Sequence, residues 1–232
     1  MRDLPPPLPP GERTVGQLVG ETIRAYGNSF LRLMPLGLPL AVVDQLSVHE
    51  PAATQAIVFW IAAPFVVGAY IYACTRIYDV PPTWQAFLLG LLVYAPFPAL
   101  RALFILPGIA WFAFIGLAVP AMLFERLGYR AALARGRELG TADYIHSLGS
   151  LATLVLVVGI AEITLTALLH SQGDSSSRAA LFLADVVLTP LLFLGGALLY
   201  ADQAARVVSS DADLHPPLDP DAAGRPDPEG QP

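Results

Sequence analysis

The chain has 232 residues, of which 55% are hydrophobic and 14% are charged, whereas ordinary globular domains carry roughly 25% charged residues. This composition argues against a water-soluble domain and indicates a membrane protein. The net charge of −6 reflects acidic residues crowded after Ser210, and the single cysteine, Cys74, excludes an intramolecular disulfide and a cysteine-based metal site.

The two ends of the chain differ from its middle. Residues 1–13 and 209–232 are rich in Pro, Gly and Asp, so both are expected to be disordered tails. Residues 14–208 then form one transmembrane helical domain. The first tail lacks the apolar core of a signal peptide, so we expect no cleavable signal and expect the first membrane helix to direct insertion.

An amphipathic helix is predicted to begin at Thr14. Thr14 and Gln17 have the spacing of a capping box, in which each side chain hydrogen-bonds to the other residue's backbone N–H. From Val15 to Tyr26, apolar residues recur at helical spacing and polar residues occupy the other face. We expect this helix to pack on the membrane surface or at the end of the bundle; docking of a partner is the alternative.

Six apolar stretches follow, each close to the roughly 20 residues that a helix needs to cross the hydrocarbon core. Arg32, Asp44 and Gln45 shorten the first stretch, so a five-span or re-entrant arrangement stays open. The sequence Leu106-Pro107-Gly108 predicts a tight turn between the third and fourth stretches. The predicted fold class is therefore all-α: a polytopic transmembrane helix bundle of about six spans, with an N-terminal amphipathic helix and disordered tails. The predicted spans are about 30–48, 54–76, 85–105, 107–124, 147–170 and 180–204.

Arginine placement predicts the orientation of these spans. All 13 basic residues are arginines, and cytoplasmic loops of membrane proteins collect positive charge. With six spans and an inner N-terminus, eleven arginines lie on the inner side, and only Arg101 and Arg178 lie on the outer side. We therefore expect a multi-pass protein of a bacterial cytoplasmic (inner) membrane with both termini in the cytoplasm.

The sequence has no P-loop, GxGxxG, HExxH or GxSxG motif, so it carries none of these enzyme signatures. Its four histidines are too scattered to suggest a metal site. We therefore expect no catalytic residue, no cofactor, no metal and no nucleic-acid partner. An active site assembled from distant residues stays open.

Four ionisable residues lie inside the predicted spans, at a similar depth in the outer half of the bilayer: Asp44, Arg101, Glu162 and Asp185. Ionisable groups are costly in hydrocarbon, which makes these residues candidates for a functional site. One interpretation is a hydrated or structural ion pair, and the other is a polar cavity that binds a solute or a lipid headgroup. In either case we expect Arg101 to face the bundle and to contact one of the carboxylates.

A second polar cluster is predicted at the inner interface, where the fourth and sixth spans end. It comprises Glu125, Arg135, Asp202 and Arg206, and we expect at least one carboxylate–guanidinium contact among them.

Further arginines follow Glu125. If the helix continues past Glu125, Arg126, Arg130 and Arg137 share one face. Such a face is typical of cytoplasmic anchoring, with specific binding of anionic lipid as the alternative.

Three stretches of the chain carry motifs of a known family. The central one, residues 106–139, has Pro-Gly opening a span, a late Pro, then Glu-x-x-Gly and Ala-Leu-x-Arg followed by Glu-Leu. Residues 14–40 look like the family's entry helix and first span, and LLYADQAARV (198–207) is similar to its closing motif, with Tyr200, Asp202 and Arg206 in place. In these stretches the chain resembles the bacterial glycerophosphoryl diester phosphodiesterase membrane-domain family and related integral membrane proteins.

The resemblance covers nearly all of residues 14–208, with two departures. Gly136 stands where the family usually has Ser, and Ala204 replaces a second Arg. The resemblance concerns only the membrane part of the family, so it implies a membrane helical fold without a catalytic domain.

The sequence supports three hypotheses for function. The first is a non-enzymatic membrane module that organises or assists membrane lipids or partner proteins, including a second copy of the chain. The second is a small solute or lipid transporter that uses the outer layer of arginine and carboxylates. The third, a membrane-embedded lipid enzyme, has the least support.

Overall fold

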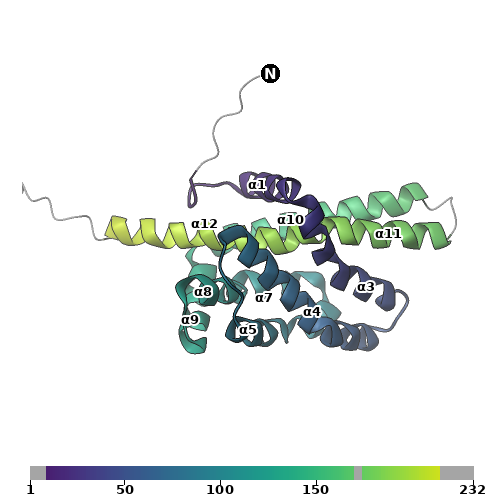
Figure 1. Ribbon diagram of the computed structural model, residues 1–232, viewed down its shortest axis with the longest axis horizontal. Helices are drawn as coiled ribbons and strands as arrows, with labels where there is room; N and C mark the ends of the chain where they lie inside the picture. Colours follow the sequence, from purple (N-terminus) through teal and green to yellow (C-terminus); the bar gives the residue numbers. More distant parts are fainter. Residues whose placement is uncertain (1–8, 170–173, 215–232) are drawn as a thin grey trace, which may run out of the picture.

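A computed structural model describes residues 9–169 and 174–214 (Figure 1). These residues are helical almost throughout, and no strand occurs among them. The predicted tails lie largely in residues 1–8 and 215–232, outside the described residues. The last helix continues to Leu214, so residues 209–214 are helical where the sequence predicts a tail.

The helices follow one another through short connections. In chain order they are α1 (Val15–Asn28), α2 (Phe30–Leu33), the 3-10 helix η1 (Met34–Gly37), α3 (Leu38–Ser47), α4 (Ala52–Tyr78), α5 (Trp84–Tyr94), α6 (Phe97–Leu103), α7 (Ile105–Ile115), α8 (Ala118–Glu125), α9 (Tyr129–Ala142), α10 (Tyr144–Leu169), α11 (Asp174–Leu188) and α12 (Pro190–Leu214).

Six helical stretches in the described residues are long and apolar enough to cross a membrane, which confirms the predicted all-helical membrane fold. Only the second and fifth of them are single unbroken helices, within α4 and α10. The stretches are Phe30–Ser47, Ala52–Tyr78, Trp84–Leu103, Ile105–Glu125, Tyr144–Leu165 and Arg178–Ser209.

Prolines account for two of the breaks. Pro96 and Pro98 separate α5 from α6, and Pro190 begins α12 directly after α11. Proline lacks the backbone N–H that a helix interior needs, so it starts a helix more readily than it continues one. Pro64 is the exception, because it lies inside the unbroken α4.

The connection between the third and fourth spans is not where the sequence predicts it. The chain turns at Phe104, whose backbone is extended with φ −171° and ψ 157°, and α7 already includes Pro107 and Gly108. Proline is tolerated in a first helical turn, where its missing N–H would have no partner. Gly108 instead lets α7 approach α6, since a Cβ there would lie 2.8 Å from the ring of Phe97.

Helices α10, α11 and α12 run along the long axis of the molecule (Figure 1). Helix α4 packs on α12 and α7 packs on α10, while α5 packs on α4 and α8. Helices α8 and α9 lie near one end. Helix α1 packs on α10 and α12 through its buried face, and both hydrogen bonds of the predicted capping box at Thr14 and Gln17 are present. The helix therefore belongs to the bundle and contributes Leu18 and Tyr26 to its core.

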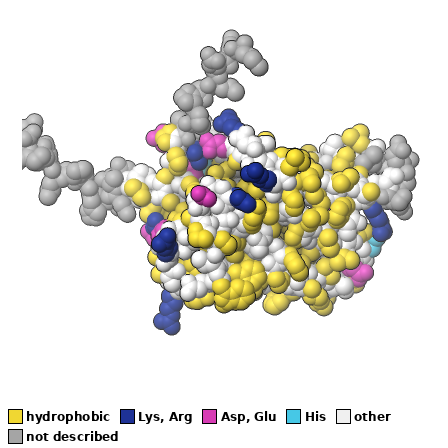
Figure 2. Space-filling view, viewed as in Figure 1, with side chains coloured by type: hydrophobic (Ala, Val, Ile, Leu, Met, Phe, Trp, Pro, Cys, Tyr) yellow, Lys and Arg dark blue, Asp and Glu magenta, His cyan; other side chains and the backbone are white. Residues whose placement is uncertain are grey.

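Hydrophobic side chains cover most of the face drawn in Figure 2, while charged side chains lie mainly over α1 and toward the two ends of the molecule. Large apolar side chains such as Ile61, Phe65 and Ile163 expose about 70% of their surface. A surface of this kind suits contact with lipid, because contiguous apolar patches are rare on soluble proteins.

Candidate functional site

A cavity of about 340 Å³ lies between α3, α4, α5, α6, α7, α8, α10 and α12. Most of its lining is apolar. Representative lining residues are Leu40, Val66, Val93, Ile109, Val155 and Phe193. One face of α10 contributes Val155, Gly159 and Glu162, which recur at helical spacing.

One part of the cavity carries charge. The Arg101 Nη2 atom lies 3.5 Å from Oδ1 of Asp44, and the guanidinium carbon lies 4.2 Å from the centre of the Phe59 ring. The contact of Arg101 with a carboxylate is therefore present, and Asp44 is the partner. Glu162 lines the same cavity as these two residues. Three of the four predicted intramembrane residues thus share one site.

The fourth residue, Asp185 of α11, is 2% exposed and is not among the described residues that line the cavity. The carboxyl groups of Asp185 and Glu162 are close enough to interact electrostatically. Oδ2 of Asp185 has no hydrogen-bond partner among the described residues. Asp185 therefore lies outside the cavity lining and adds a second carboxyl group close to that of Glu162.

Tyr94 is a residue of the site that the sequence analysis did not single out. It lines the cavity and is 4% exposed, and its hydroxyl has no hydrogen-bond partner among the described residues. Seven residues separate it from Arg101, but the break between α5 and α6 lies between them, so helical spacing gives no signal for this pair.

Where α8, α9 and α12 meet, Glu125 joins three helices. Its Oε1 atom accepts hydrogen bonds from Nε of Arg135 at 3.0 Å and from the hydroxyl of Tyr200 at 2.8 Å. Arg135 also pairs with Glu138 at 3.0 Å. Partial burial lowers the pKa of the Arg135 guanidinium, but hydrogen bonds and charges from the two glutamates raise it more, so its pKa lies above the ordinary value. These contacts hold α8 and α9 against α12.

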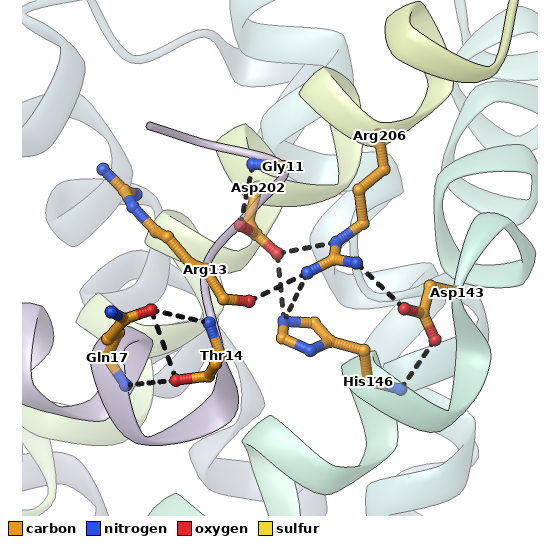
Figure 3. A network of polar contacts seen from close by, with 8 residues as sticks. All are labelled: Gly11, Arg13, Thr14, Gln17, Asp143, His146, Asp202 and Arg206. Atoms are coloured by element: carbon orange, nitrogen blue, oxygen red, sulfur yellow. Dashed lines mark hydrogen bonds and ion pairs between the residues drawn. The ribbon is translucent and has the colours of Figure 1, made fainter. Parts of the chain in front are cut away.

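Asp202 is the centre of a separate network, drawn in Figure 3. Its side chain is fully buried and accepts hydrogen bonds from Nε of Arg206 at 3.1 Å and from the backbone N–H of Gly11 at 3.0 Å. Nε2 of His146 lies 3.0 Å from its Oδ2 atom. The tautomer of His146 decides this contact: with its proton on Nε2 the ring donates to Asp202, and without that proton the same nitrogen can accept from Nη2 of Arg206, 3.5 Å away.

The same network extends from Arg206 to two further segments (Figure 3). Nη1 of Arg206 lies 3.0 Å from Oδ2 of Asp143, and Nη2 donates to the carbonyl of Arg13 at 2.9 Å. Asp143 also caps α10, because its Oδ1 atom accepts from the backbone N–H of His146. The N-terminal segment, α10 and α12 are therefore joined by charged hydrogen bonds.

The four residues predicted at the inner interface thus form two clusters. Glu125 pairs with Arg135, and Asp202 pairs with Arg206. The sequence analysis missed Asp143 and His146, although an aspartate directly before a long apolar run is a signal for a helix cap.

The helix does not continue past Glu125, so the condition under which Arg126, Arg130 and Arg137 would share one face is not met. Helix α8 ends at Glu125, and Arg126 adopts the left-handed conformation with φ 53°. The chain then starts α9 from the extended backbone of Gly128. The break changes the helix direction, so the three arginines belong to two segments.

The described residues contain no group of three or more His, Cys, Asp or Glu side chains that could hold a metal ion. The candidate sites are therefore a largely apolar cavity with one charged end and two polar clusters, one around Glu125 and the other around Asp202. No protein-family model, curated protein or solved structure matches the chain.

Proposed function

We propose that the protein binds a membrane lipid inside its helix bundle and acts as a non-enzymatic membrane module that assists lipids or a partner protein. The observation that carries this proposal is the cavity, which combines an apolar lining with a charged end at Asp44, Arg101 and Glu162. Binding sites for small amphiphiles are typically cavities of about 300–1,000 Å³ with mostly apolar walls and a few polar groups. An acyl chain fits the apolar part, and a headgroup fits the charged end.

Transport of the bound lipid is the second candidate function. The side chains of Arg101 and Asp44 keep 30% and 38% of their surface accessible, although both line the cavity. A charged end that is only partly covered supports exchange of the bound molecule with the surroundings. Binding is common to both functions, so it is tested first.

The lipid-binding prediction uses a substitution that fills the cavity. Gly159 lines the cavity, and a Cβ at this position would meet no atom within 4 Å. Gly159→Leu should therefore occupy part of the cavity without a clash at the backbone. We expect native mass spectrometry of the protein, released from a mild detergent, to show a retained lipid in the wild type and at least a several-fold smaller lipid-bound fraction in the variant.

Gly68→Leu is the matched control. Gly68 also lies within a membrane helix with no atom within 4 Å of an added Cβ, but it is not among the residues that line the cavity. The control should keep the retained lipid. Equal retention by both variants, or no lipid on the wild type, would contradict lipid binding in this cavity.

The proposed orientation places both termini in the cytoplasm of a bacterial cell. The N-terminal segment at Gly11 hydrogen-bonds to Asp202 of the last helix, which supports the same side for both ends. The excess of arginine in the predicted inner segments supports the cytoplasmic side.

Reporters fused to the two ends of the chain test this orientation. Both reporters should be active only in the cytoplasm, because an even number of spans returns the chain to its starting side. Opposite sides would mean that one span is assigned incorrectly, with Phe30–Ser47 the first to re-examine because it has the lowest mean hydropathy of the six, 1.2. Two outer reporters would reverse the proposed orientation.

A further inference from the structure

We propose that the corner between α8 and α9 binds the phosphate groups of anionic phospholipids at the membrane surface. The corner comprises Arg126, Tyr129, Arg130, Ala134 and Arg137, and none of them is among the described residues that line the cavity. The inference therefore does not depend on lipid binding inside the bundle. It follows from the position of the corner, the exposure of its side chains and the pairing of its charges.

The corner lies directly after a membrane-spanning stretch. That stretch, Ile105–Glu125, is long and apolar enough to cross a membrane, and Arg126 is the next residue. The ends of spans meet the lipid headgroups, where arginine and tyrosine side chains are common. Tyr129 at the start of α9 is 40% exposed, as such a position favours. Arg126 and the first turn of α9 are therefore at the level of the headgroups.

One face of α9 is open and carries two arginines. At about 100° per residue, Arg130, Ala134 and Arg137 lie within about 60° of one another, and all three are exposed. The two arginines are about 10 Å apart along the helix axis, at about 1.5 Å per residue. The small side chain of Ala134 lies between them and leaves room for a headgroup to reach either guanidinium.

The opposite face of α9 fixes this orientation. Ala132, Gly136 and Leu139 are buried, and a Cβ at Gly136 would lie 2.5 Å from atoms of Ala118 in α8. Arg126 is placed separately by its left-handed backbone, which ends α8. Because the arginines are displayed on a packed helix, binding costs less ordering than it would on a flexible segment.

The carboxylates of the corner are already paired. Glu125 and Glu138 each lie 3.0 Å from Arg135. From Glu125 to Glu138 the chain has four arginines and two glutamates, which gives a net charge of +2. The positive charge at this end of α8 and α9 is therefore in excess.

The other three arginines are available to an anion. Arg126 and Arg130 form no hydrogen bond or ion pair with any residue that the structure describes, and Arg137 only stacks at 5.9 Å from the centre of the Phe114 ring. Figure 2 shows basic side chains at the end of the molecule where Figure 1 places α8 and α9. The planar guanidinium fork binds phosphate oxygens in pairs, so anionic phospholipids match both the charge and the geometry of the corner.

The test compares two headgroups on the full chain. Detergent-purified protein is titrated with phosphatidylglycerol or with phosphatidylethanolamine of identical acyl chains, and native mass spectrometry gives the affinity for each. Both lipids carry a phosphate, but only phosphatidylglycerol has a net negative charge. We expect it to bind about tenfold more tightly, because each arginine near a membrane surface contributes a factor of about five for anionic lipid. Gly159→Leu, which fills the cavity, should keep this preference.

Replacing the three unpaired arginines of the corner by glutamine should bring the two affinities close together. This variant carries Arg126→Gln, Arg130→Gln and Arg137→Gln. The control removes the same total charge from exposed positions in α1, α2 and α11, and it should keep the preference. It carries Arg24→Gln, Arg32→Gln and Arg178→Gln. Arg130→Gln alone should lower the affinity for phosphatidylglycerol about fivefold, which provides a milder variant if the triple one fails to fold.

Each outcome decides between the corner and another cause. Equal affinities in the wild type would overturn the inference. A preference that survives in the corner variants would overturn it as well, and an equal loss in the control would assign the preference to net charge. A preference that disappears in Gly159→Leu would assign it to the cavity. A cavity without a retained lipid would overturn the proposed function and leave the inference about the corner unaffected.

Discussion

Replacing Asp202 by alanine should lower the free energy of unfolding by about 3 kcal/mol, the typical cost of removing one partner from a buried ion pair. Asp202 is fully buried and accepts from Arg206, His146 and the backbone of Gly11. Its removal leaves two side chains and a backbone N–H without this acceptor, in a place where water cannot easily replace it. Unfolding in detergent, followed by circular dichroism against a denaturant, measures the change.

The matched control for this prediction is Glu138→Ala. Glu138 also pairs with an arginine at 3.0 Å, but its side chain is 53% exposed. Exposed ion pairs contribute at most about 1 kcal/mol, so the control should lose little stability. Asp202→Asn should lie between the two, because the amide oxygen still accepts from Gly11 while the charge is lost. Equal losses for Asp202→Ala and Glu138→Ala would show that the network does not stabilise the fold.

Gly136→Ala should destabilise the protein by about 1–3 kcal/mol, the usual cost of forcing extra volume into a packed contact. A Cβ at Gly136 would lie 2.5 Å from the Cα, N and Cβ atoms of Ala118. Two of these are backbone atoms, so the contact cannot be relieved by a side-chain rotation. The substitution has to push α9 away from α8, and thermal unfolding of the purified protein should show a lower midpoint.

Gly20→Ala is the control for this substitution. Gly20 lies inside α1, which has 14 residues like α9, and an added Cβ would meet nothing within 4 Å. Alanine is favoured over glycine in a helix by about 1 kcal/mol, so Gly20→Ala should raise stability slightly. The opposite signs separate packing from helix propensity, and a stabilising Gly136→Ala would contradict the close α8–α9 contact.

Gly136 also bears on the resemblance to the glycerophosphoryl diester phosphodiesterase membrane-domain family, which stays a prediction. That family usually has serine where this chain has Gly136. A serine also has a Cβ, which the α8–α9 contact of this chain does not accommodate.

The sequence by itself determined the features that depend on local physics. Long apolar runs predict spans because a helix in hydrocarbon must satisfy its backbone hydrogen bonds internally. The capping box of α1 was predicted because its two residues, Thr14 and Gln17, are three positions apart. The pairing of Arg101 with a carboxylate follows from the cost of an isolated charge in the membrane, which holds whatever the partner is.

Only the tertiary structure decided which residues meet. Asp44 is 57 residues from Arg101, and Gly11 is 191 residues from Asp202. Composition and periodicity set the apolar face of each helix, but the rotation and tilt that bring one polar side chain to another depend on close packing across the whole bundle. The break at Arg126 illustrates this: α9 packs closely on α8 at Gly136, and this packing brings Arg135 to Glu125.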